Sequence, residues 1–339
     1  MKSFTVGLPL KRKSGFIENI ITHREYISEI YFSYGEFASG RSHASEFDLF
    51  HQKDQQTKDD LEALHGAGIA FNVLFNGNCF GAESLSYSLF NRIGMTVEGL
   101  SEKYNVTSVT TTSPVIARFI KENFSNIKTR ASVNMEIGTT EGFDYLSDVF
   151  DGYYLKREFN RNLKRIKTAR NWCDAHGKEL FCLANSGCLN FCSAHTFHDN
   201  LVAHESEIGK MDNAYGFDGI CHKYLKREGN ISEYLRVTNF IRPEDIPLIS
   251  EYFDGIKLAT RSNSDPSGIL DAYIKGSYNG AATALLEPDH SGLFYPKLID
   301  NRRIDPCFTK TVLSCSKQCD SCGYCKDVTN KSIIDLEEI

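Results

Sequence analysis

Short apolar segments alternate with longer amphipathic ones along most of the chain. The apolar segments are rich in β-branched and aromatic residues, which is typical of strands that are buried on both faces. We predict strands over Phe4–Leu8, Glu29–Tyr34, Ile69–Asn76, Thr107–Thr112, Lys128–Val133, Gly152–Leu155, Glu179–Ala184 and Gly255–Ala259. Eight such strands separated by helices favour a parallel sheet that closes into a barrel.

Helical patterns lie between these strands. We predict helices over Asp59–His65, from about Glu83, from Ser113-Pro114, over Asn160–His176 and over Pro243–Tyr252, with a polar insertion over residues 35–58. Ser113 before Pro114 is a typical helix start, and Gly177 is a typical helix end.

The predicted fold class is α/β, a (β/α)8 TIM-like barrel over residues 1–305. A small cysteine-rich C-terminal extension over residues 306–339 follows it. An open, doubly wound sheet is the alternative. No glycine-rich dinucleotide or P-loop motif follows any predicted strand, so nucleotide binding of those kinds has no support.

Composition narrows the range of partners. The chain has 339 residues and a net charge of −6, which argues against a broad nucleic-acid-binding surface. We interpret the basic helix over residues 161–170 as a solvated outer face. No run approaches the roughly 18 apolar residues of a membrane span, and the N-terminus does not have the pattern of a signal peptide. We therefore expect a cytoplasmic protein with no membrane partner.

Eleven cysteines are many for a cytoplasmic chain, in which disulfides are rare. Eight of them fall into two groups of four. The first group comprises Cys182, Cys188, Cys192 and Cys221, and the second comprises Cys315, Cys319, Cys322 and Cys325. Groups of four thiols indicate two metal centres rather than isolated structural thiols.

The first group is centred on the last predicted strand but one. It has one closely spaced pair, whereas a structural zinc ribbon has two. Thiolates spread over a strand end and two loops suit an iron–sulfur cluster, so we expect a 4Fe–4S cluster there. Zinc and buried free thiols remain alternatives. Cys221 is the expected fourth ligand, but Cys79 could replace it or Cys182.

The second group, C-x3-C-x2-C-x2-C, is compact enough for a complete tetrahedral site. Its first three cysteines also have the spacing of radical S-adenosylmethionine enzymes. We set that interpretation aside because the motif follows the barrel instead of its first strand. We expect this site to hold either a second 4Fe–4S cluster or a structural zinc ion, and the sequence does not favour one over the other.

Polar residues follow the strands at the end where barrel enzymes carry their active sites. They are Asn76, Ser132, Asn134, Arg157, Glu158, Lys257 and Arg261. One of them alone would be an ordinary loop residue, but together they predict a polar cavity mouth. We expect all but Glu158 to bind substrate, with Arg157, Lys257 and Arg261 holding an anionic group.

Candidates for proton transfer lie close to the same cysteines. Glu158 could form an ion pair with Arg157, or it could handle protons together with His195 or His198. His204 and His222 also flank the cysteines. Each histidine taken singly could equally be a hydrogen-bonded loop residue.

The order of these motifs resembles that of the collagenase-like peptidase family U32. In that family, one strand ends in Asn, a later one in Ser-x-Gln and a third in Arg-Glu. These strands are followed by a cysteine motif around Ser-Gly. A Lys-x-x-Gly-Arg motif then closes the barrel. The matching segments here are Asn76, Ser132-Val133-Asn134, Arg157-Glu158, Cys182 to Cys188, Arg242 to Ile246, and Lys257 to Arg261. The chain departs from the pattern at Asn134, at Thr260 and in the positions of its later cysteines.

The resemblance implies a barrel with an iron–sulfur cluster in its mouth. As in the hydroxylases of that family, it implies a redox or oxygen-independent hydroxylation reaction on an anionic small-molecule or RNA-borne substrate. It also implies a partner subunit, because members of the family sometimes work in pairs. The alternatives are a peptidase or other hydrolase, as the family label says, and a metal-bound subunit without catalytic activity.

Overall fold

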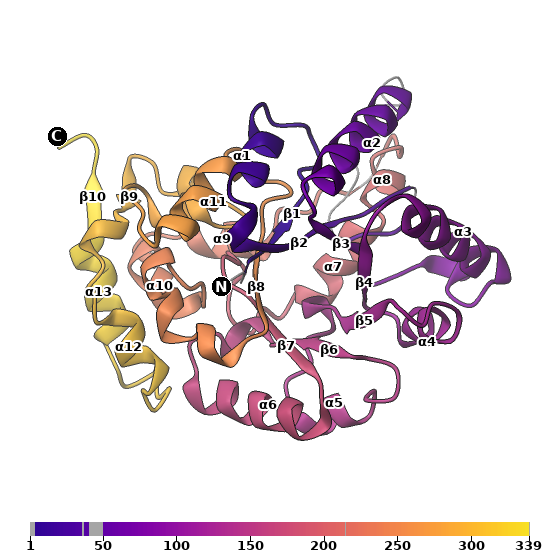
Figure 1. Ribbon diagram of the computed structural model, residues 1–339. Helices are drawn as coiled ribbons and strands as arrows, with labels where there is room; N and C mark the ends of the chain where they lie inside the picture. The colour runs from indigo at the N-terminus through magenta and orange to yellow at the C-terminus, as the bar shows by residue number, and fades with distance from the viewer. Residues whose placement is uncertain (1–3, 36, 41–49, 214, 339) are drawn as a thin grey trace.

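Eight short parallel strands close into a barrel, and their order around it follows the chain (Figure 1). The structure, a computed structural model, describes residues 4–35, 37–40, 50–213 and 215–338. The strands are β1 (Phe4–Gly7), β2 (Ile27–Phe32), β3 (Ala70–Phe75), β4 (Val106–Thr111), β5 (Lys128–Ala131), β6 (Gly152–Tyr154), β7 (Glu179–Leu183) and β8 (Gly255–Leu258). The last strand pairs with the first, with Thr5 opposite Lys257. The predicted (β/α)8 fold class is confirmed, and the open sheet is excluded.

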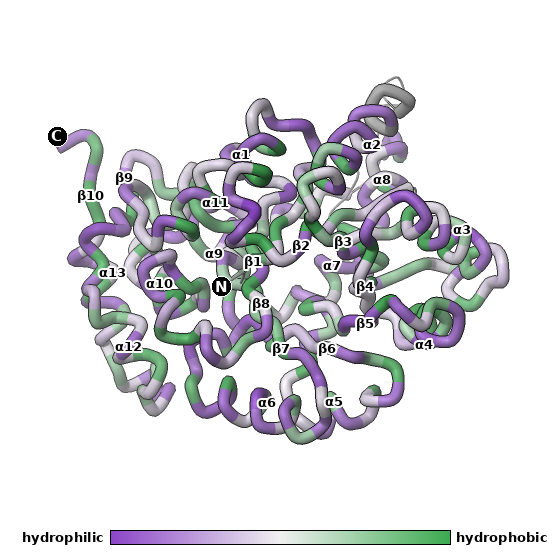
Figure 2. Tube along the Cα trace, in the orientation of Figure 1, coloured by the Kyte–Doolittle hydropathy of each residue, from purple (hydrophilic) through white to green (hydrophobic). Residues whose placement is uncertain are grey.

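Helices cover the outside of this barrel. They are α1 (Phe16–Thr22), α2 (Phe50–Gly66), α3 (Tyr87–Lys103), α4 (Pro114–Asn123), α5 (Thr140–Asp144), α6 (Leu163–His176), α7 (His195–Ala203), α8 (Glu205–Ile208), α9 (Ile220–Leu225), α10 (Tyr234–Val237), α11 (Pro266–Lys275), α12 (Phe308–Leu313) and α13 (Tyr324–Ser332). Hydrophobic and hydrophilic residues alternate along them, as expected of helices with one buried face (Figure 2).

Two details of the predicted helices are informative. The helix over 243–252 is wrong as an α-helix, because that segment forms two 3-10 helices, Pro243–Leu248 and Ser250–Tyr252. Pro247 has no backbone N–H, which disfavours a continuous α-helix. The polar insertion over 35–58 lies partly outside the described residues, and its last part belongs to α2.

The barrel interior contains a polar network beneath the mouth. Both carboxylate oxygens of Glu29 on β2 accept hydrogen bonds from Arg130 on β5, at 2.6 and 2.7 Å. Asn72 on β3 and Ser108 on β4 also donate to Glu29. Four strands are therefore joined around one buried carboxylate, and this carboxylate has little capacity left for another cation.

The C-terminal extension packs along one side of the molecule (Figure 1). Its last strand, β10 (Ile333–Asp335), pairs antiparallel with β9 (Lys297–Ile299), which precedes residue 305. The apolar residues of α12 and α13 belong to the same large hydrophobic cluster as the barrel. The extension therefore shares the core of the barrel.

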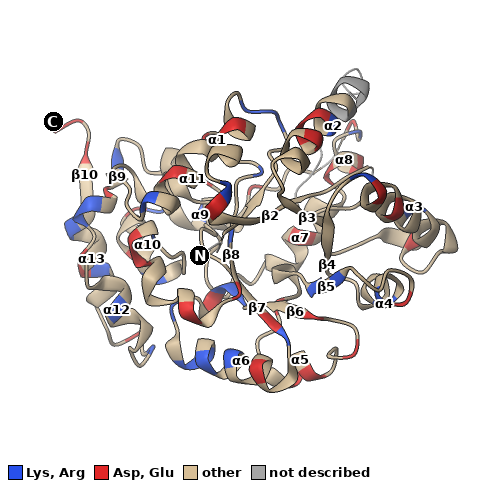
Figure 3. Ribbon diagram, in the orientation of Figure 1, with Lys and Arg blue, Asp and Glu red and all other residues tan. Residues whose placement is uncertain are grey.

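Charged residues of both signs are interspersed over the outer helices in the view of Figure 3. Of the helices that the structure describes, none is both long and apolar enough to cross a membrane.

Candidate metal centre at the barrel mouth

The centre is built where the chain leaves β7 and meets a loop that follows β8. Ser186 forms a parallel bridge with Glu287, and the Gly187 N–H donates to the Glu287 carbonyl at 3.1 Å. A Cβ at Gly187 would lie 2.2 Å from the carbonyl oxygen of Pro288. Only glycine permits this approach, and the approach holds the 286–290 loop against the loop that carries the cysteines.

The same loop delivers a buried imidazole, His290. Its donor atoms lie within 4.8 Å of those of Cys221 and His222, and no other such group of three occurs among the described residues. The Nδ1 atom of His290 lies 3.1 Å from the Tyr234 hydroxyl, whereas Nε2 is buried without a hydrogen-bond partner. Burial, aided by the charge of His222, lowers the pKa of His290 to about 4, so the ring is neutral near pH 7.

One cysteine, Cys221, lies beside this imidazole, and the charges of two others act on it. Burial raises the pKa of the Cys221 thiol, and the neighbouring charges of Cys188 and Cys192 raise it further. The charges of Cys221 and Cys188 likewise act on the hydroxyl of Tyr234, which contacts His290. Three of the four predicted central ligands, Cys188, Cys192 and Cys221, are therefore near enough to act on one another electrostatically.

The remaining predicted ligand, Cys182, points away from the other three. Phe181 and Leu183 belong to one apolar cluster, whereas Cys182 between them belongs to the large cluster under the helices. Cys182 is fully buried and lies near Tyr273 of α11. Because successive side chains of a strand face opposite sides, Cys182 faces away from the interior. Its assignment to the central centre therefore needs correction.

His195 lies beside the cysteines at the start of α7. Its Nδ1 atom is 2.5 Å from a Glu136 carboxylate oxygen, and its Nε2 atom is 3.4 Å from Asp199. Burial alone would lower the pKa of His195, but hydrogen bonds with Cys188 and Glu136 outweigh it and raise the pKa to about 9. The predicted proton-transfer residue thus contacts a predicted metal ligand.

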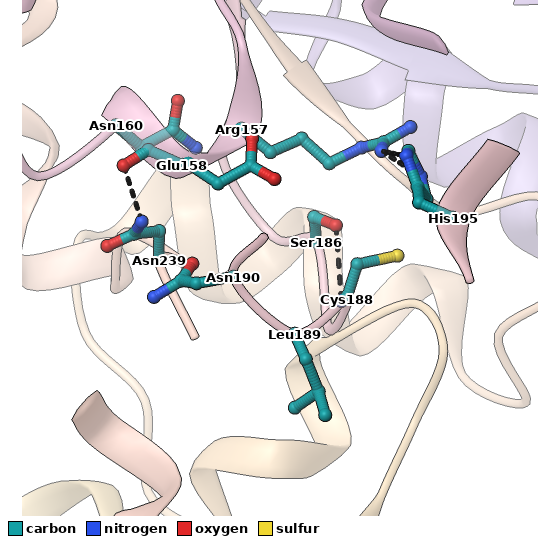
Figure 4. Close-up of a pocket in the computed structure, with 9 residues that line it drawn as sticks. All are labelled: Arg157, Glu158, Asn160, Ser186, Cys188, Leu189, Asn190, His195 and Asn239. Atoms are coloured by element: carbon teal, nitrogen blue, oxygen red, sulfur yellow. Dashed lines mark hydrogen bonds between the residues drawn. The ribbon is translucent and has the colours of Figure 1, made fainter. Parts of the chain in front are cut away.

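Arg157 turns toward this histidine and not toward Glu158 (Figure 4). Its guanidinium donates to the Asn134 side chain at 2.5 Å and lies 3.9 Å from Glu136. The Arg157–Glu158 ion pair is therefore absent from the described structure. Arg157 is held within the protein by these groups, and this arrangement disfavours a separate role as an anion clamp.

Glu158 lines a small cavity together with Ser186, Cys188 and His195 (Figure 4). The cavity has a solvent-accessible volume of about 10 Å³, which is room for roughly one water molecule. One carboxylate oxygen of Glu158 accepts from the Phe191 N–H at 3.2 Å, and the other is buried without a hydrogen-bond partner. A carboxylate with a free oxygen beside a water-sized space can accept a proton.

Lys257 and Arg261 meet at the end of β8. The Lys257 ammonium lies 3.8 Å from the centroid of the Tyr31 ring. Burial, with the nearby charge of Arg261, lowers the pKa of Lys257 to about 7. Arg261 donates to the hydroxyls of Ser33 and Ser39. The charges of these two predicted anion-binding residues therefore act on each other, whereas the contacts of Arg157 are with Asn134, Glu136 and His195.

The remaining predicted substrate-binding residues have structural partners. The Asn76 side chain accepts from the Gly40 N–H at 3.2 Å. The Ser132 hydroxyl accepts from the Asn134 N–H at 3.3 Å and caps the turn that follows β5. Asn76 and Ser132 therefore stabilise the backbone of the loops in which they lie, and these contacts account for their side chains without a substrate.

Two of the C-terminal cysteines, Cys315 and Cys325, act electrostatically on a buried arginine, Arg161. Burial raises the pKa of Cys325, and the charges of Cys315 and Cys319 add to the effect while Arg161 opposes it. Arg161 is 2% exposed, and one of its terminal nitrogens has no hydrogen-bond partner. Burial lowers the pKa of Arg161 to about 10, and the charges of Cys325 and Cys315 oppose this effect. Cys322 is exposed.

His198 and Cys79 have contacts of their own. The His198 ring lies 5.8 Å from Phe217, centroid to centroid. Cys79 has a hydrogen bond with His204, so the structure gives no support to Cys79 as a ligand of the central centre. His290 could not be predicted as a donor, since a histidine in a loop after the last strand has no spacing relation to the cysteines.

Comparison with known proteins agrees with the motifs. No model of a known protein family matches the chain. The chain is 24% identical over 312 residues to the uncharacterized protease MJ1657 of Methanocaldococcus jannaschii, covering 90% of this chain and 88% of that protein. The structure of the U32 peptidase Mk0906 superposes with a TM-score of 0.53 at 16% identity, over 76% of this chain and 92% of that one, which shows a common fold. The chain is thus similar over nearly its whole length to a protein named as a protease, and it has the barrel fold of a U32 peptidase.

Proposed function

We propose that this chain is an enzyme that holds a 4Fe–4S cluster in the barrel mouth through Cys188, Cys192, Cys221 and His290. The observation that carries the proposal is the buried Nε2 atom of His290, which has no hydrogen-bond partner and lies beside Cys221. A buried nitrogen in that condition is costly unless a ligand satisfies it. With the proton on Nδ1, directed to the Tyr234 oxygen, the lone pair of Nε2 is available for a metal.

The residues present fit such a group once Cys182 is replaced by His290. Three thiols and one imidazole provide four soft or borderline donors, which suit iron–sulfur clusters and zinc. When bound, the cluster would carry electrons in a redox reaction, and in an oxygen-independent hydroxylation it would take up the electrons that the substrate loses.

The chain's own residues supply the rest of the site. Arg261 and, below pH 7, Lys257 bind the anionic group of a small-molecule or RNA-borne substrate. Glu158 accepts a proton at its unpaired oxygen, and Glu136 orients His195 through Nδ1.

We propose a second metal centre at Cys315, Cys319, Cys322 and Cys325, either a 4Fe–4S cluster or a zinc ion. The buried, partly unpaired guanidinium of Arg161 supports this proposal, because a buried cation needs a negative partner and a metal–tetrathiolate group is anionic. A cytoplasmic location is part of the proposal and is supported by eleven cysteines that are all free in the structure.

Metal analysis of anaerobically purified full-length protein tests the central assignment. We expect about four iron and four sulfide ions at this centre, and a cluster signal in electron paramagnetic resonance. His290→Ala and Cys192→Ala should lose this iron, whereas Cys182→Ala should keep it. His222→Ala is the matched control for His290, because His222 lies in the same group but is exposed. An iron-free active protein, or full iron retention in His290→Ala, would contradict the proposal.

A hydrolase is the second candidate function, and it accords with the protease name of the relative. The water-sized cavity beside the unpaired oxygen of Glu158 favours it, because a carboxylate there can activate water. Peptide cleavage that survives Cys192→Ala and disappears in Glu158→Gln would select the hydrolase. Activity that appears only with a second protein would instead indicate a partner subunit.

A further inference from the structure

Three titratable side chains meet at the rim of the mouth, outside both cysteine groups. Cys79 lies in the loop after β3, His204 follows the last residue of α7, and Glu207 lies in α8. The Nδ1 atom of His204 is 2.7 Å from the Glu207 carboxylate, and the thiol of Cys79 has a hydrogen bond with the His204 ring. The order thiol, imidazole, carboxylate is that of an activated cysteine whose base is oriented by a third group.

The backbone of the β3 loop shapes this contact. Gly81 has a left-handed conformation, with φ near +60°, and its N–H donates to the Cys79 sulfur at 3.3 Å. A Cβ built on Gly81 would lie 3.9 Å from Cε1 of His204. The turn therefore directs a second donor at the sulfur and places the imidazole against the same loop.

The electrostatics of the pair agree with this geometry. The hydrogen bond with His204 lowers the pKa of Cys79, the Gly81 N–H adds to the effect, and burial and the Glu207 charge oppose it. The hydrogen bond with Cys79 raises the pKa of His204, and that with Glu207 adds to it. Both shifts favour a thiolate beside an imidazolium.

We propose that Cys79 is a reactive thiolate that exchanges with low-molecular-weight disulfides, and that His204, oriented by Glu207, is its positioning counter-ion. The Cys79 sulfur attacks one sulfur of the reagent, a new S–S bond forms, and the S–S bond of the reagent breaks. Cys79 is oxidised to a mixed disulfide, and the other half of the reagent leaves as a thiolate that takes a proton from solvent. This exchange does not depend on the function proposed above.

The surroundings of Cys79 suit exchange with disulfides. Exchange at sulfur needs a thiolate and access from solvent, and Cys79 is partly exposed. An adduct would also lie one residue from Asn78, whose side chain reaches the Asn134 carbonyl at 3.4 Å and Asp199 at 3.5 Å. Asp199 contacts His195, so modification of Cys79 would act on the edge of the proposed active site.

The test uses full-length protein and two probes, iodoacetamide for thiolate content and oxidised glutathione for exchange. Peptide mass spectrometry follows each cysteine separately between pH 5 and 9. Cys307 is the internal control because it is also free and is exposed. At pH 7 we expect Cys79 to react several-fold faster than Cys307 with both probes, because the hydrogen bond with His204 lowers the pKa of Cys79 and so raises its thiolate fraction.

Two variants separate activation from simple exposure. In His204→Gln the Cys79 alkylation profile should move to higher pH, and the advantage over Cys307 should disappear. Glu207→Gln is a milder change at the surface and should reduce the rate advantage of Cys79 over Cys307 only partly. It also provides a test if His204→Gln does not fold. Equal rates for Cys79 and Cys307 in the wild type, or an unchanged pH profile in both variants, would overturn the proposal.

Discussion

Replacing Lys257 by methionine should stabilise the protein most at low pH. The ammonium projects into the barrel beside the rings of Tyr31 and Tyr154. The interior carboxylate that could neutralise it, Glu29, is occupied by Arg130. Burial first, and then the charge of Arg261, therefore lower the pKa of the Lys257 amine from 10.5 to about 7. Methionine retains a flexible side chain of similar length without the charge.

The magnitude follows from the two proton affinities. The amine has a pKa of 10.5 in its ordinary state and about 7 in the folded protein, and a pKa difference of one corresponds to 1.36 kcal/mol. The buried charge thus destabilises the folded state by up to about 5 kcal/mol below pH 7. Between pH 7 and 10.5 the unfolded chain binds more protons than the folded protein, so the stability of the wild type rises with pH. The advantage of Lys257→Met should therefore shrink by roughly 2–3 kcal/mol between pH 6 and pH 9.

Urea unfolding of both proteins at the two pH values measures this difference. Trp172 is the single tryptophan of the chain and packs against Tyr153, so its fluorescence reports on the core. The charged groups that act on Lys257 are two arginines and two glutamates. Side chains of these two kinds ordinarily titrate outside the range from pH 6 to pH 9. The pH dependence of the difference therefore belongs to Lys257. A difference that is equal at pH 6 and pH 9 would refute the reasoning.

Three further changes probe the centre and the interior. Gly187→Ala should reduce the metal content without unfolding the barrel. The new Cβ would collide with the Pro288 carbonyl and displace the loop that carries His290. Iron analysis measures the metal content, and circular dichroism checks the fold. Arg130→Met should lower the free energy of unfolding by about 3–5 kcal/mol, because it leaves Glu29 charged and buried; urea unfolding checks this. Arg161→Gln should weaken metal retention at the C-terminal centre alone; metal analysis during chelator titration checks this.

Each of these expectations has an outcome that contradicts it. Full metal content in Gly187→Ala would mean that the 286–290 loop does not position a ligand. A further loss of stability on adding Glu29→Gln to Arg130→Met, instead of a partial recovery, would contradict the unpaired-charge argument. Equal loss of metal from both centres in Arg161→Gln would show that the arginine acts on the fold and not on the C-terminal thiolates.

The strands were predictable because a parallel barrel buries both of their faces. Most of their sequences are therefore compact runs rich in apolar residues, and all eight strands lie within about two residues of the expected ends. The same property conceals which side chains face inward. Phe181, Cys182 and Leu183 are all apolar in character, so the inward pair could not be distinguished from the outward cysteine until the sheet was closed.

The contacts of the mouth could be predicted only in part. Arg157 and Glu158 are adjacent in sequence, but their side chains diverge because they start a 3-10 turn and not a helix face. Arg157 instead finds Asn134, which follows the preceding strand of the barrel. His290 depends on the contact between Gly187 and Pro288, and a contact between segments so far apart in sequence leaves no local pattern.

The contact between Gly187 and Pro288 also has a consequence for the order of assembly. Three separate segments supply the donors: the loop after β7, the start of α9, and the loop after β8. A chain emerging from the ribosome carries Cys188 and Cys192 long before it carries His290. The complete set of donors therefore forms only after β8 has closed the barrel against β1. Insertion of the metal would then be a late, post-translational step, and the barrel would have to fold first with its thiols unprotected.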